Sequence, residues 1–300
     1  MNPILALLMG QCWALDPIVM ERMAAIIMRW SDGVRLSAEQ ISAAVGDAPQ
    51  AAAQRRSKAS GQGIQVIPLY GVISHRANMV QSVSGPGGTS TELFGRALDQ
   101  AMADPNVGAI LIDIDSPGGS VHGTQELADR IMAARGTKPI VASANATAAS
   151  AAYWIASAAD EIVVTPSGLV GSIGVIAAHE DKSAKLAAEG TKVTYITAGK
   201  FKAEGNSSAP LTDEAAAAMQ SMVDGFYAAM VKSIAKGRNT SPDAVRAQYG
   251  QGRVLSATDA LAVGMVDSIE TFDQTVARLQ NPRRRSRVAA NSALRLAEAS

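Results

Sequence analysis

Two adjacent glycines follow a strongly apolar run in the middle of the chain. The segment "AILIDIDSPGGSV" (109–121) is typical of a buried strand that ends in a tight turn, with Gly118 and Gly119 in that turn. Backbone N–H groups in such a turn can bind a phosphate, a carboxylate, or an oxyanion that forms only during a reaction. The anion that these amides bind decides the kind of site.

The phosphate patterns are absent from this part of the sequence. A P-loop requires G-x-x-x-x-G-K-[ST], and no lysine follows the two glycines at that spacing. The G-x-G-x-x-G fingerprint of dinucleotide-binding folds is also missing. An oxyanion hole remains as the chemical interpretation, and a plain turn that uses glycine for clearance remains as the structural one.

A serine within a run of small residues is the candidate nucleophile. Ser150 lies in "NATAASAAYWIASAA" (145–159), where a helix is expected to begin after the strand "PIVASA" (139–144). Small neighbours leave room for a substrate, and a helix N-terminus favours negative charge. The N–H of Ala151 could then be a further oxyanion donor. A well-packed helix start without catalytic meaning is the alternative.

A serine hydroxyl needs a base to become a good nucleophile, and the sequence offers two. His179 follows the predicted strand 173–177, and Lys202 follows the predicted strand 192–197. A lysine acts as a base only if burial or hydrogen bonding lowers its pKa from about 10.4 toward 7. Lys200 would point to the other side of an extended chain. Spacing alone does not choose between the bases.

The elements around these residues predict an α/β fold. Further strands are expected at 64–73 and 161–166, and helical patterns occupy the stretches between the strands. A longer helix is expected from the cap Thr212 to Gly237, and another begins at Ser241. Strands that alternate with helices imply largely parallel sheets whose faces are covered by helices.

The chain divides into four segments by composition. Residues 1–45 are expected to form short helices, 46–63 a flexible linker, 64–272 the catalytic domain, and 273–300 a helix followed by a mobile basic tail. The apolar start has no preceding Lys or Arg, and no run reaches the roughly 18–20 residues of a membrane span. We therefore expect a cytoplasmic protein with no membrane partner.

Composition excludes several other classes of function. The 300 residues carry no formal net charge, and five Arg against one Glu in 281–300 make only the tail basic, so a nucleic-acid partner is not expected. One cysteine, Cys12, excludes a disulfide framework, and three histidines without H-E-x-x-H argue against a zinc enzyme. We expect neither a metal nor a cofactor.

Five motifs in series resemble the signal peptide peptidase A family of serine peptidases. They span about residues 64–270 and read "DSPGGSV", "ATAASAAYWIASAAD", "VGSIGVI", "AGKFKAEG" and "GRVLSATDALAVGMVDSI". The resemblance implies Ser150 as nucleophile, Lys202 as general base and Ser172 as the hydroxyl that holds the lysine amine. It also implies the Gly119 N–H as an oxyanion donor with Gly118 beside it, the Clp/crotonase-like fold, and assembly into homo-oligomeric rings.

The chain departs from the membrane members of that family. We expect no N-terminal anchor and only one peptidase-like unit, and Ala151 and Ala152 stand where two glycines often follow the serine. Its opening resembles the branch of tailed-phage capsid-assembly proteases, which implies cleavage of capsid or scaffold proteins inside the prohead, in the host cytoplasm.

Several alternatives stay open. One is a signal-peptide-degrading peptidase of the same family, and another is a Clp-like triad of Ser150, His179 and an Asp. The pattern S-x-x-K at Ser233–Lys236 would be a different dyad, although K-T-G and S-D-N are missing. The remaining two are a crotonase-like protein that binds an acyl thioester and an inactive scaffold or interaction protein.

Overall fold

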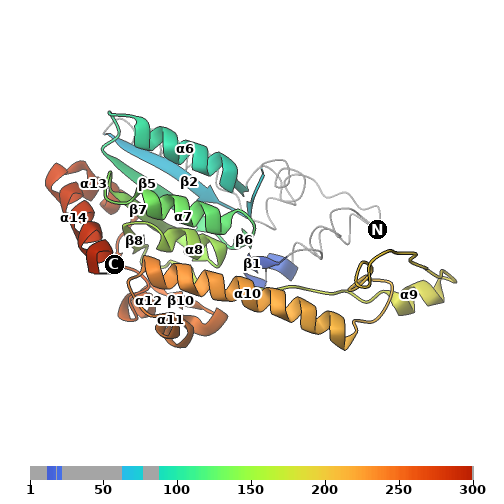
Figure 1. Ribbon diagram of the computed structural model, residues 1–300. Coiled ribbons are helices and arrows are strands. Elements are labelled where there is room, and N and C mark those ends of the chain that lie inside the picture. Colours follow the sequence, from blue (N-terminus) through green and yellow to red (C-terminus); the bar gives the residue numbers. More distant parts are fainter. Residues whose placement is uncertain (1–11, 18, 22–62, 77–87, 299–300) are drawn as a thin grey trace.

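The computed structural model describes residues 12–17, 19–21, 63–76 and 88–298 (Figure 1). The strands are β1 (Trp13–Leu15), β2 (Ile64–Tyr70), β3 (Ile73–Ser74), β4 (Thr89–Ser90), β5 (Ala109–Ser116), β6 (Gly118–Ser120), β7 (Ile140–Ala149), β8 (Glu161–Val164), β9 (Leu169–Gly171), β10 (Val254–Ser256) and β11 (Ser268–Ile269). The helices are α6 (Thr91–Ala103), α7 (Thr124–Ala134), α8 (Ala151–Ser157), α9 (Ser183–Ala188), α10 (Asp213–Gly237), α11 (Pro242–Gln248), α12 (Ala257–Ala262), α13 (Phe272–Gln280) and α14 (Pro282–Glu298).

The larger sheet is parallel except at one edge. Its strand order is β10-β9-β7-β5-β2, with β8 also paired to β7 and β11 to β8, and only β9 and β10 are antiparallel. The long strand β7 pairs with β8 through its first half and with β9 through Thr147–Ala149. Ser150 directly follows the last residue of β7. A smaller sheet has the order β1-β6-β3-β4.

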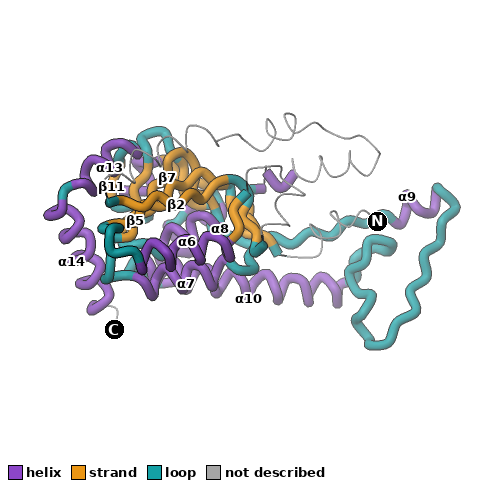
Figure 2. The backbone as a smooth tube through the Cα atoms, turned by 90° about the horizontal axis from the view of Figure 1, so that it is seen from above, coloured by secondary structure: helices purple, strands orange, loops and turns teal. Residues whose placement is uncertain are grey.

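Alternate residues of the larger sheet are buried on opposite faces. In β5, Ile110, Ile112 and Ile114 belong to the large apolar core that also contains residues of α6, α7, α8 and α10. Leu111 belongs to a second core under α13 and α14. Figures 1 and 2 show helices on both sides of the strands. Burial on both faces explains the near-continuous apolar runs, and the predicted α/β fold with helix-covered parallel sheets is confirmed.

Helix starts and most strands lie where the sequence predicted them. Thr212 and Ser241 cap α10 and α11, each accepting a hydrogen bond from a backbone N–H of the first turn. Two predicted strands are wrong. Residues 192–197 are exposed and form no strand, and in 173–177 only Ile176 makes a single bridge, to Trp13. Both segments are rich in β-branched and other apolar residues, but a strand also needs a partner along its whole length.

The two ends of the chain also differ from the expectation. Residues 13–15 of the expected helical segment form β1, and the predicted linker lies, except for Gly63, outside the described residues. At the other end a helix, α14, replaces the mobile tail, and Val288 in it is buried in the same core as Phe272 and Leu279. Pro282 is tolerated because it stands at the start of this helix. Among the described helices, none is long and apolar enough to cross a membrane.

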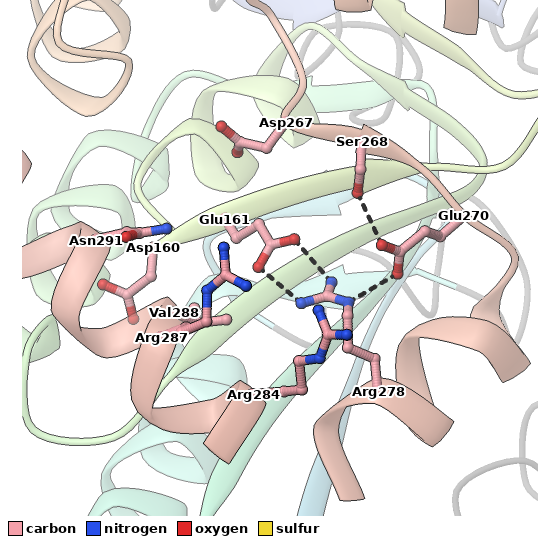
Figure 3. A pocket seen from close by; sticks show the side chains of 10 residues that line it. All are labelled: Asp160, Glu161, Asp267, Ser268, Glu270, Arg278, Arg284, Arg287, Val288 and Asn291. Atoms are coloured by element: carbon pink, nitrogen blue, oxygen red, sulfur yellow. Dashed lines mark hydrogen bonds and ion pairs between the residues drawn. The ribbon is translucent and has the colours of Figure 1, made fainter. Parts of the chain in front are cut away.

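A charged cavity of about 300 Å³ lies where α13 and α14 meet β8 and β11 (Figure 3). Arg278 donates two hydrogen bonds to Glu161, of 3.0 and 2.7 Å, and one of 3.0 Å to Glu270. Burial raises the pKa of the Glu161 carboxyl, and the positive charge of Arg278 opposes that rise. The ion pairs thus link the C-terminal helices to the sheet.

Replacing Arg278 with methionine is expected to lower the free energy of unfolding by about 2 kcal/mol, because Glu161 would lose its ion-pair partner and Glu270 would keep only its hydrogen bonds from Ser268 and Thr275. The loss should be smaller than for a fully buried pair, since the side chains of Arg278 and Glu161 are 19% and 16% exposed. Arg246→Met is the matched control. Its ion pair with Asp243 is 44% and 96% exposed, and its loss should cost less than about 0.5 kcal/mol. Urea unfolding measures the free energy of unfolding of both variants. Equal losses of stability would contradict the larger contribution that we assign to the Arg278 ion pairs.

Candidate active site

Ser150 occupies a strained turn between β7 and α8. Its backbone angles are φ 55° and ψ −116°, a region that side-chain-bearing residues rarely adopt. Such a conformation costs about 1–3 kcal/mol and persists only where the surroundings enforce it. Here the Ser150 N–H donates to the Gly171 carbonyl at 2.6 Å, and the Ser150 carbonyl accepts from the Trp154 N–H at 2.9 Å. The turn therefore holds the serine in a fixed place.

The side chain of Ser150 is enclosed by backbone from two other segments. Its Oγ donates to the Gly174 carbonyl at 3.4 Å, and the residue is only 1% exposed. Gly118 packs against it, because a Cβ atom placed on Gly118 would lie 3.0 Å from the Ser150 Cβ. Gly118 also has φ +103°, so a larger residue would be strained there as well.

The predicted oxyanion donors lie in this region but differ in their partners. The Gly118 N–H donates to the Ser116 Oγ at 3.2 Å, and Ser116 Oγ donates to the Gly71 carbonyl at 2.6 Å. Gly119 lies in β6, paired with Ala14 of β1 on one side and Ile73 of β3 on the other. Ala151 opens α8, so its N–H has no acceptor within that helix. The Gly118 N–H is thus hydrogen-bonded to Ser116, and Gly119 is paired with strands of the smaller sheet.

Ser172 lies next to the same turn. It follows Gly171, whose carbonyl binds the Ser150 amide, and its own N–H donates to the Arg253 carbonyl at 2.8 Å. Ser172 has φ 52° and is 5% exposed. The structure therefore brings Ser150, Ser172, Gly118 and Ala151 into one region, and two non-glycine residues of that region carry the uncommon positive φ.

Lys202 does not belong to this cluster. It lies in an excursion between β9 and α10, residues 178–212, which we call the arm. Figures 1 and 2 show the arm extending away from the sheets, beyond the end of α10. Lys202 is exposed, and its N–H closes a turn on the Gly199 carbonyl at 3.2 Å. In the described chain, the predicted base and nucleophile are not brought together, and the dyad stays a prediction.

The arm carries several exposed apolar side chains. Ile196 is 97% exposed, and Val193, Tyr195 and Phe201 are each at least 43% exposed. Lys200 points to Glu214, with an Nζ–Oε1 distance of 2.8 Å, and its amine lies over the Phe201 ring. Several large apolar side chains exposed within one segment make the arm a candidate contact site.

The two rival bases lie elsewhere too. A ring nitrogen of His179 is 3.1 Å from the Asn206 carbonyl, a contact within the arm. Ser233 and Lys236 lie on α10, with Lys236 exposed in its last turn. No hydrogen bond between the described residues joins Ser150 to His179, to Lys202 or to Lys236.

One element of the region was not predicted from the sequence. Strand β1 pairs with β6 beside Ser150, and its Trp13 bridges to Ile176. The signal was weak, since "CWAL" is a short apolar run that continues at helical spacing into the residues after it. The Gly174 carbonyl was missed as well, because a backbone acceptor leaves no mark in a sequence.

Comparisons with known proteins give the family. The model of peptidase family S49 matches residues 133–285, which include Ser150, Ser172 and Lys202. The head-tail preconnector protein GP5 of Enterobacteria phage P21 is 35% identical over 69% of this chain and 40% of its own length. The capsid assembly protease C of Escherichia phage lambda is 34% identical over 72% of this chain and 48% of its own length.

A bacterial protease is also similar to this chain. Protease 4 of Salmonella typhi is 32% identical over 64% of this chain and 31% of its own length. The chain therefore spans less than half the length of these curated relatives. The family match, the phage and bacterial relatives and a fold consistent with the Clp/crotonase-like architecture confirm the predicted family, and the chain belongs to peptidase family S49.

Proposed function

We propose that this chain is a serine endopeptidase in which Ser150 is the nucleophile and Lys202 the general base. The observation that carries the proposal is the strained turn at Ser150, held between β7 and α8 with Gly118 packed against it. Strain of this kind gathers at functional sites. Membership of peptidase family S49 supports a peptidase activity for this turn.

The proposed reaction uses the groups around Ser150. The neutral amine of Lys202 takes the Oγ proton as Oγ bonds to the scissile carbonyl carbon, and the Ser172 hydroxyl holds that amine. The N–H groups of Gly119 and Ala151 donate to the resulting oxyanion, and each such donor typically contributes about 10²–10³ in rate. The proton passes to the leaving amine as the C–N bond breaks, and water hydrolyses the acyl-enzyme.

The scheme requires the arm to take another position or another partner. Lys202 lies on exposed chain next to the apolar Phe201, and in the described part of the chain the apolar side chains of Val193, Tyr195 and Ile196 are exposed. We infer that these side chains pack against a second copy, in line with a ring-shaped homo-oligomer.

The proposed substrates are capsid or scaffold proteins of a phage or prophage, cut inside the prohead in the host cytoplasm. The name of the lambda relative, a capsid assembly protease, supports this choice. Degradation of signal peptides is the alternative within the same family, and the similarity to the bacterial protease 4 supports it more weakly.

A comparison of cleavage rates decides between these substrates. The full chain is incubated with the scaffold and capsid proteins of the genome that encodes it, and separately with a set of signal peptides, with Ser150→Ala as the blank. We expect faster cleavage of the scaffold or capsid protein. Faster cleavage of signal peptides would support the alternative, and no cleavage of either by an active-site-titrated enzyme would contradict both.

A further inference from the structure

We propose that the slot between β6 and Ile176 is the peptide-binding site of this chain, and that its own residues 12–16 occupy that slot as an internal competitor of the substrate. We call residues 12–16 the blocking segment. The inference deepens the proposed function and rests on it only for the claim that Ser150 cuts the bound peptide. A substrate would then bind after the blocking segment has left.

Hydrogen bonds hold the blocking segment along both of its edges. Toward β6, the Asp16 N–H donates to the Pro117 carbonyl at 2.9 Å, and the Val121 N–H donates to the Cys12 carbonyl at 3.5 Å. Toward the other wall, Trp13 and Ile176 exchange two bonds of 2.9 and 2.8 Å. An extended segment that is added to an exposed strand edge is a general mode of peptide recognition.

The walls of this slot are the same segments that enclose Ser150. A Cβ atom on Gly118 would lie 2.3 Å from the Ala14 carbonyl oxygen and 3.0 Å from the Ser150 Cβ, so this one position touches both. On the other wall, Ser150 Oγ bonds to the Gly174 carbonyl, two residues before Ile176. The Ala14 carbonyl therefore lies beside the candidate nucleophile.

The pairing register brings the blocking segment to a proposed oxyanion donor. Ala14 is opposite Gly119, midway between the hydrogen-bonded positions Cys12–Val121 and Asp16–Pro117. Hydrogen-bonded and non-bonded pairs alternate in antiparallel strands, so Ala14–Gly119 is a hydrogen-bonded position. A substrate carbonyl that needs the Gly119 N–H would have to replace the Ala14 carbonyl.

Burial and side-chain size indicate the kind of peptide that fits. Cys12, Trp13, Ala14 and Leu15 are each no more than 4% exposed, and Ser150 beneath them is 1% exposed. Ala14 itself is 0% exposed, so a larger side chain at its position would have to displace neighbouring atoms. The slot therefore takes an extended peptide with a small residue at that place and apolar residues on either side.

A reversible lock tests whether the blocking segment controls access. Cys12 is the only cysteine of the chain and is opposite Val121 in a hydrogen-bonded pair, where Cα atoms are about 5.5 Å apart and within disulfide range. In the Val121→Cys variant, oxidation with diamide should therefore join the introduced thiol to Cys12 and fix the segment in the slot. Dithiothreitol releases it in the same molecule. Failure of the disulfide to form would overturn the placement of the segment and the proposal with it.

A second variant opens the slot instead of locking it. Trp13→Pro removes the N–H that bonds to Ile176 and part of the packing of the segment, so it should release the slot. The probe is a fluorescein-labelled peptide, GQSWALDP, which copies residues 10–17 with Cys12→Ser. Its affinity should be lowest for the locked form, higher after reduction and highest for Trp13→Pro, with at least about a tenfold span because the free slot is a minor state in the closed chain. Should Trp13→Pro fail to fold, the locked and reduced forms still give the comparison.

Labelling of Ser150 by a fluorophosphonate, measured on the same three forms, separates this inference from the proposed function. Lower peptide affinity and slower labelling in the locked form support both. A fall in peptide affinity with no labelling of any form supports the blocking segment and rejects Ser150 as an activated nucleophile. Labelling that is detectable and equally fast in the locked and reduced forms, equal peptide affinity of these forms, or no peptide binding in any form would overturn the blocking segment.

Discussion

Replacing Ser150 with alanine is expected to abolish peptide-bond cleavage and to leave the fold intact. The change removes the oxygen that would bond to the scissile carbonyl carbon, and loss of a serine nucleophile lowers the rate by at least about 10⁴-fold in comparable enzymes. Among the described residues the hydroxyl makes one hydrogen bond, 3.4 Å long, so the free energy of unfolding should change by less than about 1 kcal/mol. Cleavage of denatured casein and thermal melting of the variant and the parent measure the two effects.

Ser233→Ala is the matched control for this experiment. Ser233 belongs to the S-x-x-K pattern on α10 and should be dispensable for cleavage. Activity that survives in Ser150→Ala and disappears in Ser233→Ala would reject the nucleophile assignment in favour of that pattern.

Replacing Lys202 with methionine is expected to lower the cleavage rate by about 10²–10⁴-fold, the usual contribution of a general base. The parent rate should rise with pH on its acidic side, because only the neutral amine accepts a proton. Lys200→Met is the matched control, since Lys200 is two residues away in the same arm and is paired with Glu214. Casein cleavage measured over a series of pH values compares the two variants with the parent.

Two further outcomes refine the lysine assignment. His179→Ala should cost little, whereas an inactive His179 variant beside an active Lys202 variant would support the Clp-like triad. Mixing Ser150→Ala with Lys202→Met should restore part of the activity if the arm of one copy serves the serine of another. If the subunits have been shown to exchange and the mixture still has no activity, each arm must reach the Ser150 of its own chain.

Features set by neighbours in sequence could be predicted well. Thr212 and Ser241 start their helices because a hydroxyl at a helix start binds free N–H groups, and β5 shows its two-sided burial in an unbroken apolar run. The position of Ser150 between a strand and a helix start could be predicted because both patterns are local in the sequence.

Features set by distant partners could not be predicted. Trp13–Leu15 form a strand only because β6 offers an edge more than a hundred residues away in the sequence. Residues 192–197 show the pattern of a strand but have no partner among the described residues, and the position of Lys202 depends on what the arm contacts. The helix α14 in place of the expected tail packs on a core through Val288. The basic residues around Val288 give no sign of this packing in the sequence.

Mapping a covalent label to its residue tests the central claim most directly. The full chain is treated with a fluorophosphonate, digested, and read by mass spectrometry, beside Lys202→Met and Lys200→Met. The account predicts an adduct on Ser150 in the parent and in Lys200→Met, and strongly reduced labelling in Lys202→Met. An adduct on a different serine, or Ser150 labelling that is as fast without Lys202 as with it, would contradict a peptidase built on Ser150 and Lys202.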